Sequence, residues 1–117
     1  MKYMLLLYAD ESKGPQTPEE VQAVAPAWYA FGNDAKAAGV LLGNHGLNPV
    51  ADATTLRVRE GRALVADGPF AETPEQLGGY YLLDCQDLDE ALAWAGKIPT
   101  AKYGSIEIRP LNRWSQG

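Results

Sequence analysis

The pattern of apolar and polar positions along the chain predicts several short strands. Lys2 to Ala9 is apolar on both faces, as is typical of a buried strand. Alternating positions on both sides of Glu60-Gly61-Arg62 predict a hairpin, because a short glycine-containing turn joins two strand-like runs. The strands expected after the first cover Val40 to Leu47, Thr54 to Arg59, Ala63 to Ala66, Tyr80 to Leu83 and Ser105 to Arg109.

Two further segments have helical spacing. Thr17 to Glu20 forms a capping box, and small or apolar residues then recur every three or four positions before Gly39, a typical helix stop. Because Pro26 interrupts this segment, we expect either a bend there or two shorter helices. Asp87 to Glu90 is another capping box and opens a second helix, which Gly96 closes. The expected apolar stripe of the first helix is Val21, Val24, Trp28, Phe31, Ala35 and Ala38, and that of the second is Leu88, Ala91, Leu92 and Ala95. Trp94 lies outside the second stripe and is a candidate for a dimer contact.

The order of elements is β-α-β-β-β-β-α-β. It predicts an α+β fold with a ferredoxin-like core, in which two helices cover one face of an antiparallel sheet and the hairpin is an elaboration. The 117 residues suit one domain, residues 1–117. With three Trp and six Tyr, a half-covered sheet would expose a larger apolar patch than a soluble monomer usually tolerates. We therefore expect a C2 homodimer.

Charge and cysteine content narrow the function. A net charge of −5 argues against nucleic acid and anionic membrane as partners, because binding phosphates needs clustered Lys and Arg. Cys85 is the only cysteine, which excludes an intrachain disulfide and a Cys-rich zinc site and favours a reducing cytoplasm. The first apolar run ends at Asp10 and Glu11, too short for a signal peptide or a membrane span. No phosphate-binding glycine motif occurs and metal-ligating residues are few, so we expect neither cofactor nor metal.

One central run of residues carries a recognisable signature. Asp67-Gly68-Pro69-Phe70-Ala71-Glu72 leads to Gly78-Gly79-Tyr80-Tyr81, and the chain opens with Lys2-Tyr3-Met4-Leu5-Leu6-Leu7 and closes near Ile106-Glu107-Ile108-Arg109-Pro110. These residues resemble the YCII-related family, in particular the branch named after its Asp-Gly-Pro-Phe (DGPF) signature. The resemblance implies that two sheets pack face to face into a dimeric α/β barrel that encloses a cleft. It also implies a link of some members with transcription initiation factors, through gene fusions and neighbourhoods.

Asp67 is the first candidate catalytic residue. It follows a strand and shares the face of Val65, and Pro69 fixes its own φ while Gly68, before a proline, is expected to be extended. A half-buried carboxylate held at a cleft rim has a raised pKa, which suits a general acid or base. The alternative is structural, because an Asp before Gly commonly accepts hydrogen bonds from turn amides.

His45 is the second candidate catalytic residue. It is the only histidine and thus the only side chain with an ordinary pKa near neutrality, and the neighbouring glycines give it room to reach a pocket. The alternative is a histidine that is solvated or bonded to backbone. A better-studied branch of the family that the chain resembles pairs an Asp with a His placed after a Pro-Ala step in the first helix. In this chain Trp28 follows Pro26-Ala27, so the histidine of that branch has no counterpart at this position. Its role could be carried over only if His45 substitutes for it in space.

Arg57, Arg109 and Tyr80 are candidate substrate-binding residues. Each arginine lies on the polar face of an alternating strand, where it could hold a substrate carboxylate through a bidentate fork if that face lines the cleft. The alternatives are a solvated face or an intersubunit salt bridge. Tyr80 and Tyr81 point to opposite faces, so that one hydroxyl meets the cleft.

Two functions remain open at this point. The first is a cofactor-free acid–base enzyme of the isomerase or lyase type, in which Asp67 shuttles a proton, His45 assists and an arginine holds a small acidic or aromatic substrate. The second is a non-catalytic regulatory module that binds a small molecule or another protein.

Overall fold

The computed structural model describes residues 1–114 of the chain. Its strands are β1 (Lys2–Ala9), β2 (Leu41–Gly46), β3 (Thr54–Arg59), β4 (Arg62–Asp67), β5 (Gln76–Asp84) and β6 (Ser105–Pro110), and its helices are α1 (Pro18–Ala37) and α2 (Leu88–Ala95). Three short 3-10 turns, η1 (Glu11–Lys13), η2 (Val50–Asp52) and η3 (Pro99–Lys102), lie in the connections. The predicted number and order of strands and helices are confirmed. Within the described residues, no helix has the length and apolar character needed to cross a membrane.

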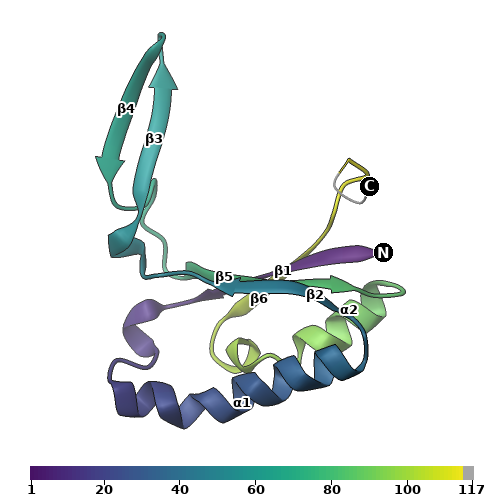
Figure 1. The fold of residues 1–117 in the computed structure, drawn as a ribbon. Coiled ribbons are helices and arrows are strands. Elements are labelled where there is room, and N and C mark those ends of the chain that lie inside the picture. Colours follow the sequence, from purple (N-terminus) through teal and green to yellow (C-terminus); the bar gives the residue numbers. More distant parts are fainter. Residues whose placement is uncertain (115–117) are drawn as a thin grey trace.

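Four strands form an antiparallel sheet in the order β2-β5-β1-β6. Both helices cover the same face of this sheet (Figure 1), so the expected mixed α+β layering is confirmed. The core between sheet and helices contains aromatic pairs, among them Phe31 edge-on to Tyr81 with ring centroids 4.8 Å apart. The buried apolar residues are Tyr3, Leu5, Leu7, Phe31, Ala35, Val40, Tyr81, Leu83, Cys85, Ala91, Ala95 and Ile98.

The ends of the helices follow the predicted capping boxes. The Glu20 amide donates to Thr17 Oγ1 at 3.1 Å, and the Glu90 amide donates to Asp87 Oδ1 at 2.9 Å. Gly39 has a φ of +74°, the left-handed conformation that favours glycine at a helix end. Helix α1 runs without interruption through Pro26, so the alternative of two shorter helices is wrong.

The apolar stripes of the helices differ in part from the prediction. Val21 is 53% exposed because the first half of α1 extends beyond the sheet that would cover it (Figure 1). In α2, Ala91 and Ala95 are buried but Leu88 and Leu92 are exposed. Trp94 packs edge-on to Phe31 with ring centroids 6.0 Å apart and is partly buried against the core, while its expected role at a dimer contact stays a prediction.

In the part of the chain that the structure describes, no helix covers the other face of the sheet (Figure 1), and we call it the open face. The strand register sets its cross-strand rows, because residues that pair directly point to the same side. One row consists of His45, Tyr80, Leu6 and Glu107, and the next consists of Gly43, Leu82, Met4 and Arg109. The open face is therefore apolar in the middle and polar at both edges.

Strands β3 and β4 form a separate two-stranded sheet, which we call the arm (residues 54–67). The arm extends away from the four-stranded sheet on the side opposite the helices (Figure 1). Within the described residues, the extensive contacts of β3 and β4 are with each other. Leu56 and Val65 pair directly on one face of the arm and are 62% and 68% exposed. An isolated two-stranded hairpin is marginally stable in water, so an arm of this kind needs a partner surface.

Candidate functional site

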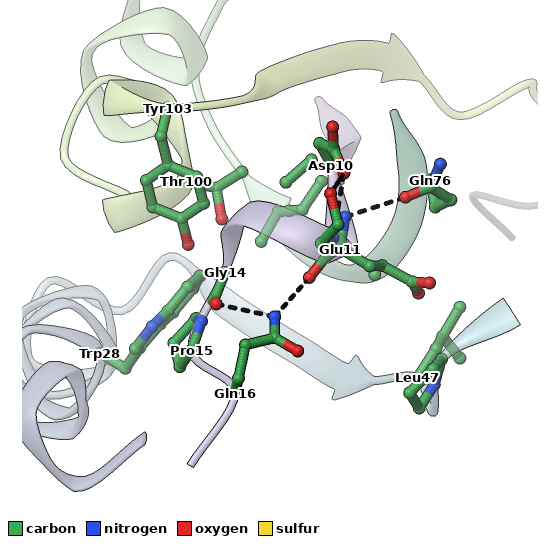
Figure 2. Close-up of a pocket in the computed structure, with 15 residues that line it drawn as sticks. Asp10, Glu11, Gly14, Pro15, Gln16, Trp28, Leu47, Gln76, Thr100 and Tyr103 are labelled. Atoms are coloured by element: carbon green, nitrogen blue, oxygen red, sulfur yellow. Dashed lines mark hydrogen bonds between the residues drawn. The ribbon is translucent and has the colours of Figure 1, made fainter. Parts of the chain in front are cut away.

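A cavity of about 610 Å³ lies at one end of the sheet, and we call it the end cavity. Its walls are the loop that follows β1, the middle of α1 and the turn η3 (Figure 2). Trp28, Tyr103 and Leu7 provide apolar surface, and Gln76 and Thr100 provide polar atoms. The other lining residues are Ala9, Asp10, Glu11, Ser12, Gly14, Pro15, Gln16, Leu47, Pro49 and Gly78.

Glu11 is the central residue of the hydrogen-bond network that holds this loop in place (Figure 2). Its amide donates to Gln76 Oε1 at 2.9 Å, and its carboxylate accepts from the Val50 amide at 3.1 Å. Gln16 Nε2 donates to the carbonyls of Glu11 and Gly14, each at 2.8 Å. The Glu11 carboxylate thus joins the loop to η2, so its role at the cavity wall is structural.

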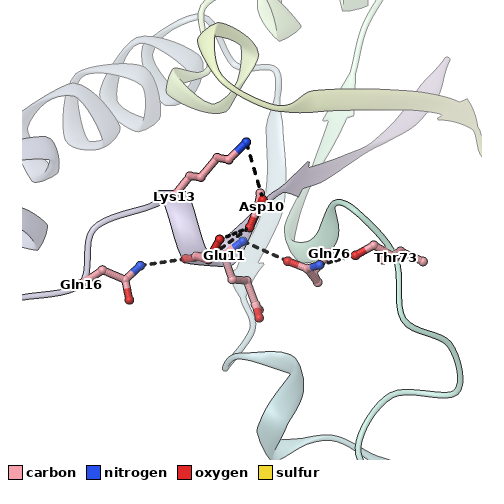
Figure 3. Close-up of polar contacts among 7 residues, drawn as sticks. Asp10, Glu11, Lys13, Gln16, Thr73 and Gln76 are labelled. Atoms are coloured by element: carbon pink, nitrogen blue, oxygen red, sulfur yellow. Dashed lines mark hydrogen bonds and ion pairs between the residues drawn. The ribbon is translucent and has the colours of Figure 1, made fainter.

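The side chain of Asp10 makes its polar contacts within the same loop (Figure 3). Its Oδ1 accepts from the Ser12 hydroxyl at 2.6 Å and from the Ser12 amide at 3.0 Å, and Lys13 Nζ lies 3.9 Å from Oδ2. These hydrogen bonds, with a smaller contribution from Lys13, lower the pKa of Asp10 below its ordinary value. Asp10 is therefore held as a carboxylate and is a poor proton donor.

A second cavity of about 270 Å³ adjoins the first at the β2 edge of the sheet, and we call it the edge cavity. The two cavities share Leu7, Trp28 and Gly78. The edge cavity is also lined by His45 and Tyr80, along with Asn44, Gly46, Gly79 and Tyr81. Trp28 stacks on Tyr81 with an interplanar angle of 11° and ring centroids 6.5 Å apart. The wall common to both cavities thus contains one aromatic ring, that of Trp28, which packs on Tyr81.

Gly79 allows β2 and β5 to approach closely beside the edge cavity. A Cβ atom built on Gly79 would lie 2.8 Å from the His45 carbonyl oxygen and 3.3 Å from Gly46 Cα. No residue other than glycine fits there without a shift of the backbone, and the close approach places His45 directly opposite Tyr80.

Asp67 lies away from both cavities, as the last residue of β4 in the arm. Its side chain is exposed and shares the face of Thr54 and Val65, as the alternation predicted. The expected extended geometry of Gly68 is wrong, because its φ is +97°. The Gly68 amide donates to the Ala53 carbonyl at 2.6 Å, so this turn is closed by backbone rather than by the Asp67 carboxylate.

The two candidate arginines lie on different parts of the molecule. Arg57 is on the arm, where its Nη2 donates to the Phe70 carbonyl at 3.3 Å. Arg109 is on β6, paired with Met4 at the edge of the open face far from β2. Among the described residues, no Lys or Arg lines the end cavity or the edge cavity. Of the five candidate residues, His45 and Tyr80 are brought together, Arg109 shares their sheet face, and Asp67 and Arg57 are on the arm.

Comparison with known proteins identifies the family. The model of the YCII-related domain matches residues 1–115. The chain belongs to the YCII-related family. An uncharacterized protein of Rhizobium meliloti (strain 1021) is 42% identical over 120 residues, covering 100% of this chain and 97% of the relative. The recognition of the YCII-related family from the sequence is thus confirmed.

One solved structure resembles this YCII-related chain at low identity. It is 5-chloro-2-hydroxyhydroquinone dehydrochlorinase (TftG) from Burkholderia phenoliruptrix AC1100, in complex with 2,5-dihydroxybenzoquinone. The identity is 12% and the TM-score 0.49, with 96% of this chain and 94% of that chain covered.

Sequence reasoning about this YCII-related chain missed most of the cavity residues. Glu11, Gln76 and Tyr103 come from three separate connections, and no local pattern links them. Trp28 was expected on the core-facing stripe of its helix and does pack against the core, but it also forms part of the wall shared by the two cavities. The sequence signal nearest to it was the Pro26-Ala27 step, after which the resemblance implied a histidine in another branch and this chain has Trp28.

Proposed function

We propose that this protein binds a small aromatic molecule and transfers a proton to or from it without a cofactor. The observation that carries this proposal is the junction of the two cavities at Trp28, beside the β2 edge of the sheet, where the side chain of His45 lies on the open face. A proton-transfer site needs an apolar wall to position the substrate and a side chain that can accept and donate a proton. Trp28 and His45 supply these two parts.

The lining of the cavities favours an uncharged aromatic ligand over a carboxylate. Trp28, Tyr103 and Leu7 offer flat apolar surface, and Gln76, Thr100 and Asn44 can exchange hydrogen bonds with hydroxyl groups. Among the described lining residues there is no cation to neutralise an anion, and two carboxylates lie in the wall. A phenol or a hydroxylated ring therefore fits this site better than a keto acid.

His45 is the proposed general acid or base, and Tyr80 is the proposed orienting residue. Their rings are neighbours on adjacent strands, with centroids 5.8 Å apart and planes tilted by 49°. A substrate hydroxyl that reaches the polar ends of both side chains can exchange a proton with the imidazole while the phenol of Tyr80 donates a hydrogen bond. Asp67 takes part in this scheme only if another copy of the chain brings it to the cavity, because its own strand lies on the arm.

We further propose that the protein is a homodimer in which two ferredoxin-like sheets pack through their open faces into a dimeric α/β barrel. Leu6, Met4 and Leu82 lie in the middle of the open face, and the exposed apolar face of the arm lies on the same side of the molecule. A two-fold axis would cover both surfaces with one contact. Together with the single cysteine, this assembly is consistent with a protein of the reducing cytoplasm.

A single-histidine chain allows a direct test by NMR. In the untagged protein, the imidazole carbon-bound protons of His45 give one set of signals, which can be followed while phenol, catechol, benzoate or pyruvate is added. We expect phenol and catechol to shift these signals in a saturable way, and Trp28→Leu to weaken that binding by at least about tenfold. Benzoate and pyruvate serve as the anionic comparison.

Catalysis is tested by proton exchange from ring carbon positions of the bound phenols in deuterated water. His45→Gln is expected to slow exchange by about 100-fold or more while leaving the affinity within about threefold. If binding is saturable but the ring protons exchange no faster than in buffer alone, the proton-transfer step is refuted and the protein is one that only binds the molecule. If only benzoate and pyruvate shift the His45 signals, the proposal that the ligand is an uncharged phenol is refuted.

A further inference from the structure

The arm presents three arginines on one face. In the β3–β4 register Arg59 pairs with Arg62, and Arg57 pairs with Leu64. The three arginine side chains therefore lie on the same face of the hairpin. Arg59 and Arg62 are directly opposite each other, and like charges in that position destabilise a strand pair. Their arrangement is favourable only when acidic groups lie close to them.

Within the described residues, these arginines have no acidic partner. Neither observed ion pair involves the arm. Arg57 donates to the Phe70 carbonyl, and Arg59 Nη1 donates to the neighbouring Val58 carbonyl at 3.1 Å. The charges on this face of the arm are therefore not neutralised by any acidic side chain among residues 1–114.

An acidic hollow lies on the open face of the sheet. It has a volume of about 640 Å³ and is lined by Tyr8, Pro74, Glu75, Ser105 and Glu107. Tyr8 pairs with Ser105, and Glu107 pairs with Leu6, so the hollow belongs to the face opposite the helices. Within the described residues, neither Glu75 nor Glu107 forms an ion pair. The hollow thus has two carboxylates available for basic groups.

We propose that the arm of one copy lies in the acidic hollow of a second copy, with Arg59 and Arg62 against Glu75 and Glu107. Outside the arm the chain has 13 acidic and 7 basic residues, so another copy attracts the arm, whereas nucleic acid would be repelled by the net charge of −5. A two-fold axis lets both arms make the same contact at once. This inference rests on the proposed homodimer and adds the element that fixes how the two copies are aligned.

Charge reversal separates this contact from the rest of the interface. Two variants, Arg62→Glu and Glu107→Arg, are each examined alone and as an equimolar mixture by sedimentation velocity over a range of concentrations. Each variant alone is expected to raise the dimer dissociation constant by at least about tenfold, because two like charges then meet at both contacts. In the mixture, the reversed arm meets the reversed hollow and the original arm meets the original hollow, so dimers return to within about threefold of the wild-type affinity.

Matched controls make the outcome decisive. Lys36→Glu changes an exposed charge at the end of α1, on the helix side, and is expected to leave the dissociation constant unchanged. Leu82→Glu places a charge in the middle of the open face and tests the proposed sheet contact. If Leu82→Glu dissociates the dimer but neither charge reversal does, the arm contact is overturned and the proposed homodimer still stands. A monomeric wild type would overturn both, and a mixture that stays as dissociated as its components would exclude the pairing of Arg62 of one copy with Glu107 of another.

Discussion

His45 lies directly opposite Tyr80 in the register of β2 and β5, and their rings are tilted by 49° with centroids 5.8 Å apart. This pair depends on the close approach of the two strands at Gly79. The geometry of the edge cavity is therefore set by a backbone contact as much as by the side chains that line it.

Gly79→Ala is expected to lower the free energy of unfolding by about 1–3 kcal/mol, because the added methyl would lie 2.8 Å from the His45 carbonyl. The imidazole signals of His45 are expected to move as well. Gly43→Ala is the matched control in β2, since its Cβ would meet nothing within 4 Å. Urea unfolding followed by circular dichroism compares the two variants, and equal losses would show that the approach of the strands is not the cause.

Glu11→Ala is expected to destabilise the loop of the end cavity. Its loss leaves the partly buried Val50 amide without an acceptor, at a cost of about 1–3 kcal/mol. Glu11→Gln keeps an oxygen in place and is expected to recover most of this loss. Urea unfolding of the three proteins measures the difference. A Gln variant as unstable as the Ala variant would mean that the charge of Glu11, and not its acceptor, supports the loop.

Alkaline pH is expected to destabilise the fold through Cys85. Burial, with the nearby carboxylate of Glu90, raises the pKa of this thiol from 9.0 to about 11. Between these values the unfolded chain loses the thiol proton while the folded chain keeps it, so the free energy of unfolding falls as pH rises from about 9 to about 11. Burial also raises the pKa of Tyr81, which adds to the fall.

The contribution of the thiol is isolated by Cys85→Ala. Urea unfolding at several alkaline pH values is expected to give a shallower decline for this variant than for the wild type, with the Tyr81 contribution remaining. Parallel declines in the two proteins would contradict the assignment to Cys85.

Asp67→Asn is expected to change the free energy of unfolding by no more than about 0.5 kcal/mol, because the carboxylate is exposed at the end of the arm. Gly68→Ala is expected to cost about 1–2 kcal/mol, because φ at that position is +97°. Thermal unfolding distinguishes the two. A large loss in Asp67→Asn would give the carboxylate a structural role in the turn that its exposure does not suggest.

Local sequence signals were sufficient for most of the fold. Thr17, Asp87 and Gly39 act within one or two turns of the chain, so their patterns predicted the helix ends correctly. The errors have tertiary causes. Val21 continues the apolar spacing of α1 but has no sheet beneath it, and Trp94, which lies off the apolar spacing of α2, packs on Phe31 of α1.

The candidate site was less accessible from the sequence for a related reason. His45 and Tyr80 were chosen for their chemistry, and the strand pairing that joins them is a contact between distant segments. Glu11 and Gln76 are 65 positions apart, and their hydrogen bond depends on the bulge that shifts the register of β1 and β5 between Leu7 and Tyr8. A pattern read along one chain segment does not contain that information.

The separation of the arm from the helix-covered sheet also bears on how related chains diverge. Because β3 and β4 make their extensive contacts with each other, charges on the arm can be exchanged without disturbing the core or the cavities. A related chain in which the charges of both the arm and the acidic hollow are reversed would still fold. It would form dimers with identical copies and not with the parent chain. Duplicated genes could thus acquire separate partners through a few surface substitutions, long before their ligands differ.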